Sequence, residues 1–130
     1  METGASGYNI ADHMCNGSSV LSASGANPSL LPFTSKTLNN HWGGKSDHSD
    51  EYPELSKGLY AELAHDLVCA ATSETVLGYR AADGSIVRYN KSTNDFVKSG
   101  SKGIRTMFKP KRGIAYFNDK MKSDGGVQND

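Results

Sequence analysis

Two groups of side chains in this chain have the types needed to cleave a phosphodiester without a metal ion. One group lies in a polar loop and the other in a run of strand-like segments: His41, Lys45 and His48, then Arg88, Thr106 and Lys109. A histidine can remove the proton of a 2′-hydroxyl or protonate a leaving 5′-oxygen, because its pKa lies near neutrality. Arginine and lysine can hold the phosphate, and threonine can donate a hydrogen bond to it. Together these groups could cleave RNA.

Each of these side chains also has an ordinary interpretation. Arg88 could be a solvated strand cation, His48 an ordinary loop histidine and Lys109 a solvated strand end. Residue types alone therefore do not assign a role, and the elements that position the groups must decide.

Charge is distributed unevenly along the chain, although the total is zero. Residues 1–79 carry a net charge of −6, residues 80–122 carry +8, and residues 123–130 carry −2. The basic second half predicts a surface for phosphate groups. The alternative is that the acidic first half packs on it.

Two other kinds of site compete with metal-free cleavage. Seven potential ligands fall within residues 39–51, as in an HNH-type metal nuclease: Asn39, Asn40, His41, Asp47, His48, Asp50 and Glu51. However, the glycines and serines between them give no strand signal, and no HExxH, EF-hand or CxxC motif is present. We therefore expect no metal and no other cofactor. A non-catalytic module that binds RNA or an acidic protein remains the second alternative.

Residues 56–71 give the clearest helical pattern. Ser56 is a suitable N-cap, and apolar residues recur at i, i+3 and i+4 from Leu55 to Ala71. This spacing predicts that His65 lies on the solvent side. Cys69 falls in the same helix, and with only one other cysteine, Cys15, and no CxxC motif, we expect two free thiols.

From residue 75 the period changes to two, which predicts four consecutive antiparallel strands at about 75–80, 85–90, 95–99 and 104–108. An Asp83-Gly84 turn joins the first pair. The order indicates an α+β fold, in which an N-terminal helical part packs on a small twisted antiparallel four-stranded sheet. If the helices cover Val87 and Tyr89, Arg88 points to an open face.

The same alternation places Thr106 on the face opposite Lys109. These two side chains could converge only if the chain bends or bulges before Pro110. One of them could therefore be structural.

Three regions follow from the composition. Residues 1–32 are predicted to be a weakly ordered lead-in or linker, residues 33–122 the functional domain and residues 123–130 a loose tail. Residues 113–122 are expected to pack as a turn or short helix through Ile114, Tyr116 or Phe117, and Met121. The start of the chain lacks the features of a signal peptide, and no apolar run approaches the roughly 20 residues of a membrane helix, so no membrane contact is expected.

Several stretches resemble one family. DGSIVRYNKSTNDFV, KGIRTMFKP and the following YF are similar to the C-terminal sheet of the BECR-fold ribonucleases (barnase, EndoU, colicin E5/D and RelE-like). NNHWGGKSDHSDEYP resembles the loop that precedes the single helix of this family, and LYAELAHDLV resembles that helix. The resemblance spans residues 38–118 and is nearest to toxin domains of contact-dependent growth inhibition and other polymorphic bacterial toxins.

The resemblance implies a metal-independent endoribonuclease, often a tRNase, that a cognate immunity protein neutralises. It also implies secretion as the C-terminal part of a larger effector and action in the cytoplasm of a target cell. Whether a host activating factor is needed stays open. Carried over by position, the family's site residues correspond to Lys45, His48, Arg88, Thr106 and Lys109. Because two residues separate Lys45 from His48, the proton-transfer histidine could be His41 or His48.

Overall fold

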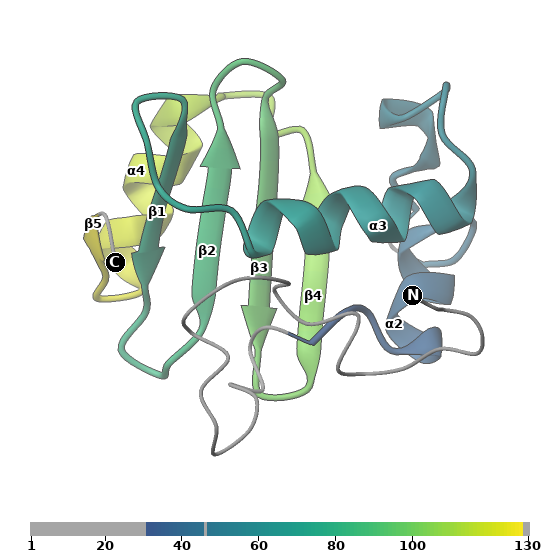
Figure 1. Cartoon of the computed structure of the whole chain (residues 1–130), viewed down its shortest axis with the longest axis horizontal. Coiled ribbons are helices and arrows are strands. Elements are labelled where there is room, and N and C mark those ends of the chain that lie inside the picture. Colours follow the sequence, from purple (N-terminus) through teal and green to yellow (C-terminus); the bar gives the residue numbers. More distant parts are fainter. Residues whose placement is uncertain (1–30, 46, 129–130) are drawn as a thin grey trace.

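The computed structural model describes residues 31–45 and 47–128, so the predicted lead-in lies almost entirely outside the described residues. The elements in chain order are α2 (Ser35–His41), the 3₁₀ turn η2 (Ser49–Glu51), α3 (Lys57–Val68), β1 (Val76–Arg80), β2 (Ile86–Asn90), β3 (Asp95–Gly100), β4 (Gly103–Phe108), α4 (Ile114–Ser123) and β5 (Val127–Gln128). The predicted α+β order, helix and then antiparallel sheet, is confirmed (Figure 1).

The strands form one antiparallel sheet in the order β4-β3-β2-β1-β5. The four predicted strands form a meander, and β5 adds a two-residue strand beside β1, where Arg80 pairs with Val127. The folded domain therefore continues past residue 123, where we had placed the start of a loose tail.

One face of the sheet packs against α3, which crosses in front of the strands in Figure 1. Ser56 caps α3 as predicted, because its hydroxyl oxygen accepts a hydrogen bond from the N–H of Leu59 at 3.2 Å. Tyr60 anchors the helix: its ring is fully buried and its hydroxyl donates to the carbonyl of Met107 at 2.6 Å. This bond fixes α3 against β4 across 47 residues of sequence.

The second face packs against α4, which corrects the prediction that this face is open. Phe117 is the buried residue of α4, and it stacks on Tyr89 at a centroid distance of 5.8 Å and contacts Tyr79 at 5.5 Å. Ile114, which was expected to pack, is instead 45% exposed. Both faces of the sheet are thus covered, by α3 on one side and α4 on the other.

A bulge in β4 changes which side chains share a face. Lys98 pairs with Thr106, but Ser99 pairs with Ile104, which leaves Arg105 as the extra residue. Ile104 and Met107 consequently both join the core under α3, although simple alternation would place them on opposite faces.

Three predictions about residues 56–71 are wrong. His65 is buried rather than solvated, with 9% of its surface exposed, and Leu59 on the predicted core stripe is 50% exposed. Cys69 is disulfide-bonded rather than a free thiol, and its sulfur lies 3.6 Å from Nε2 of His65. Cys15 lies outside the described residues. None of the helices within residues 31–45 and 47–128 is long and apolar enough to span a membrane.

Candidate acid–base site

His41 and His48 lie side by side at the two ends of the loop between α2 and η2. Their ring centroids are 5.5 Å apart with planes inclined by 30°, and the N–H of His48 donates to the carbonyl of His41 at 2.8 Å. Asp47 closes the loop, because its Oδ1 accepts the N–H groups of Gly43 and Ser49 at 2.8 and 2.9 Å. The loop therefore positions the two imidazoles as a pair.

The His41 ring is held from the side of α2. Its Nδ1 donates to the carbonyl of Thr37 at 3.0 Å, and the ring contacts Phe33 at a centroid distance of 5.7 Å. Burial lowers the pKa of His41 from its ordinary value of 6.5; the Thr37 hydrogen bond opposes this shift and the charge of His48 adds to it. His41 is therefore biased towards the neutral form, with the lone pair on Nε2.

The His48 ring is held from the side of η2 and the sheet. Its Nδ1 lies 2.6 Å from Oε2 of Glu51, and the ring stacks on Phe108 of β4 at 5.5 Å and 24°. Glu51 is itself fixed, since its Oε1 accepts the backbone N–H of Lys109 at 2.6 Å. Within the described part of the chain, no hydrogen bond is made by Nε2 of His41 or by Nε2 of His48.

Lys45 lies in the same loop, four residues after His41. Its side chain is exposed and makes no hydrogen bond or ion pair with the residues that the structure describes.

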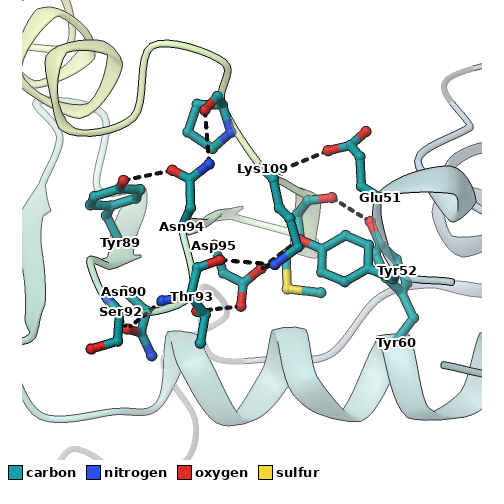
Figure 2. A network of polar contacts seen from close by, with 12 residues as sticks. Glu51, Tyr52, Tyr60, Tyr89, Asn90, Ser92, Thr93, Asn94, Asp95 and Lys109 are labelled. Atoms are coloured by element: carbon teal, nitrogen blue, oxygen red, sulfur yellow. Dashed lines mark hydrogen bonds and ion pairs between the residues drawn. The ribbon is translucent and has the colours of Figure 1, made fainter. Parts of the chain in front are cut away.

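Lys109 belongs to a polar network around the buried carboxylate of Asp95 (Figure 2). Its ammonium group donates to Oδ1 of Asp95 and to the carbonyl of Thr93, both at 2.9 Å, and lies 4.8 Å from the centre of the Tyr52 ring. Asp95 is only 3% exposed and also accepts the hydroxyls of Tyr52 and Thr93. The charge of Lys109 therefore neutralises a buried carboxylate.

Arg88 lies on the α3 side of β2, not on an open face. Its Nε donates to the carbonyl of Ala70 at 3.0 Å and its Nη1 to that of Val87. The guanidinium lies across Gly78 of β1, where an added Cβ would come within 2.4 Å of Nη1. It therefore extends away from β4, which is two strands or about 9–10 Å distant. Arg88 is not brought beside the histidine pair.

Thr106 is not brought there either. Thr106 of β4 pairs with Lys98 of β3. Its neighbour Met107 faces α3, so Thr106 lies on the α4 side of the strand together with Phe108. The bulge at Arg105 precedes both Thr106 and Lys109, so it leaves their opposite parity unchanged.

The structure thus groups three of the six predicted residues, His41, Lys45 and His48, and adds Glu51, which had been considered only as a metal ligand. Among the described residues there is no cluster of three or more histidine, cysteine, aspartate or glutamate side chains suited to a metal ion.

Comparison with known proteins gives no assignment, since no protein-family model matches this chain and no curated protein matches it.

Proposed function

We propose that this domain is an endoribonuclease that cleaves RNA without a metal ion, using His41 and His48 as its acid–base pair. The observation that carries the proposal is the geometry of the two rings. Each imidazole is held through Nδ1, and the centroids lie 5.5 Å apart. A phosphodiester bound across the Nε2 edges of the two rings can meet one Nε2 with its 2′-oxygen and the other with its 5′-oxygen.

The environments of the two rings suggest which histidine acts as the base and which acts as the acid. His41, with its lowered pKa, removes the proton from the 2′-hydroxyl, which attacks the phosphorus. His48, whose Nδ1 contacts the carboxylate of Glu51, acts as the acid and donates a proton from Nε2 to the leaving 5′-oxygen. The P–O5′ bond breaks, and the products are a 2′,3′-cyclic phosphate and a 5′-hydroxyl. Lys45 offsets the charge that grows on the phosphate.

The resemblance to BECR-fold toxin domains extends this proposal to a biological role. We propose a bacterial toxin, secreted within a larger effector, that acts on tRNA in the cytoplasm of a target cell and is neutralised by an immunity protein. An acidic surface on that partner would complement the basic residues 80–122.

The test is cleavage of total RNA and tRNA by the purified wild type in EDTA, with the chemistry of the new ends determined. Cyclic phosphate ends are expected, with a loss of at least about a hundredfold in His41→Gln and in His48→Gln. Lys45→Ala should reduce the rate less, and Lys91→Ala, which removes an exposed lysine in the β2–β3 turn, should leave it unchanged.

Three results would contradict the proposal in different ways. Abolition of cleavage by EDTA excludes the metal-free mechanism. Undiminished cleavage in both histidine variants excludes the assigned pair. Binding of RNA by the wild type without any cleavage favours the non-catalytic module.

A further inference from the structure

Glu51 is the carboxylate that contacts a ring of the histidine pair among the residues that the structure describes, and both of its oxygens are engaged. Oε2 lies 2.6 Å from Nδ1 of His48, and Oε1 accepts the N–H of Lys109 at 2.6 Å. The Glu51 side chain is about 31% exposed and that of His48 about 24%, so water screens this ion pair only in part. A carboxylate with two fixed contacts has one orientation.

We infer that Glu51 is the positioning residue of the proposed ribonuclease site, and that it sets the tautomer of His48. It resembles in its role the carboxylate that orients the histidine of a serine-protease triad, where the imidazole donates its Nδ1 proton to the carboxylate. This inference rests on the proposed function for its catalytic meaning, but its structural content, the tautomer of His48, can be measured without any substrate.

The reason lies in which atoms can donate. The N–H of Lys109 can only donate, so the atom of residue 51 that faces it must accept. The other oxygen of Glu51 can then only accept from His48, which places the proton of a neutral imidazole on Nδ1 and the lone pair on Nε2. When the ring carries a second proton, that proton is on Nε2, and Nε2–H becomes the proton donor.

The substitution Glu51→Gln reverses this pattern with little change in shape. The amide oxygen keeps the hydrogen bond from Lys109, so the amide NH₂ is turned towards His48. An NH₂ group donates, and Nδ1 must then accept, which moves the proton of the neutral ring to Nε2.

Two measurements test the inference, and the control in both is Glu54→Gln. This variant makes the same chemical change three residues away, at an exposed glutamate that makes no hydrogen bond with the described residues. The first is the ¹⁵N NMR signature of the His48 ring at about pH 9, well above the ordinary imidazole pKa of ~6.5. We expect the Nδ1–H tautomer in the wild type and in Glu54→Gln, and the Nε2–H tautomer in Glu51→Gln. An unchanged tautomer in Glu51→Gln overturns the inference even if the protein cleaves no RNA.

The second measurement is kcat/KM for RNA cleavage at a temperature at which both variants are fully folded. In Glu51→Gln the amide NH₂ faces Nδ1, so the ring cannot keep a proton on Nδ1 while it donates one from Nε2, and we expect kcat/KM to fall about tenfold. A role limited to stability would lower the melting temperature but leave kcat/KM of the folded protein as in Glu54→Gln. Wild-type cleavage with an unchanged kcat/KM in Glu51→Gln overturns the inference and leaves the proposed function standing, whereas absence of wild-type cleavage counts against the proposed function alone.

Discussion

Replacement of Lys109 by methionine separates a catalytic role from a structural one. Methionine keeps the length of the side chain and removes the ammonium group. The structure predicts a loss of stability, because Lys109 is the cation that faces the buried carboxylate of Asp95. Any loss of cleavage should follow the loss of folded protein.

The magnitude follows from the exposure of the two partners. Removing one member of a fully buried ion pair costs about 3–5 kcal/mol, whereas an exposed pair contributes about 0.2–1 kcal/mol. The Asp95 side chain is 4% exposed and that of Lys109 is 31% exposed, which places this pair between the two limits. Tyr52 and Thr93 still donate to Asp95 in the variant. We therefore expect a loss of about 2–3 kcal/mol, or roughly 10 °C in melting temperature.

Urea unfolding of a double-mutant cycle is the assay. Asp95→Asn alone should cost about 1–2 kcal/mol, because the partly exposed Lys109 can be hydrated. The double variant should be about as stable as Lys109→Met, so the coupling energy should reach about 1 kcal/mol or more. Lys91→Met, at an exposed turn position, should change stability by less than about 0.5 kcal/mol.

The reasoning is refuted if Lys109→Met unfolds at the same urea concentration as the wild type. It is refuted in a more informative way if the variant stays fully folded and loses cleavage, because Lys109 would then be catalytic after all.

Two further predictions concern pH and backbone geometry. Folding lowers the pKa of His41 below 6.5, so the unfolded state binds more protons as the pH falls below that value and the folded protein loses stability. Urea unfolding between pH 7.5 and 5 should therefore show a smaller loss of stability in His41→Gln than in the wild type. Equal losses in the two proteins would contradict this. Gly103 has φ +100° and an added Cβ would lie 2.3 Å from the carbonyl oxygen of Pro32, whereas Gly84 has φ +91° in open space. Thermal melting should therefore show a loss of about 1 kcal/mol for Gly84→Ala and clearly more for Gly103→Ala, and equal losses would contradict the backbone contact.

The elements could be predicted from the sequence where one period dominates. The N-cap Ser56 and the apolar spacing define α3, and alternation from residue 75 defines the meander. Faces were harder to predict. A short helix after the strands, α4, covers the side expected to be open, and a single extra residue, Arg105, puts Ile104 and Met107 on one face.

Only the part of the site whose residues are close together in the sequence could be predicted. His41, Lys45 and His48 lie within eight residues of sequence, so their proximity was visible. The role of Lys109 was not, because it depends on Asp95 and Tyr52, which are distant in sequence or on another element. Glu51 could have been found as a carboxylate three residues after His48, one turn away, but its second contact, to Lys109, is 58 residues away and carries no local signal.

The hydrogen bond between Glu51 and the N–H of Lys109 also bears on the order in which the chain is synthesised. Both histidines leave the ribosome early, but the groups that fix His48, the ring of Phe108 and the amide of Lys109, are made after the first three strands of the meander. A nascent chain that stops within β4 would carry all of its proposed proton-transfer groups without the means to align them. Assembly of the histidine pair thus waits until nearly the whole domain has been translated.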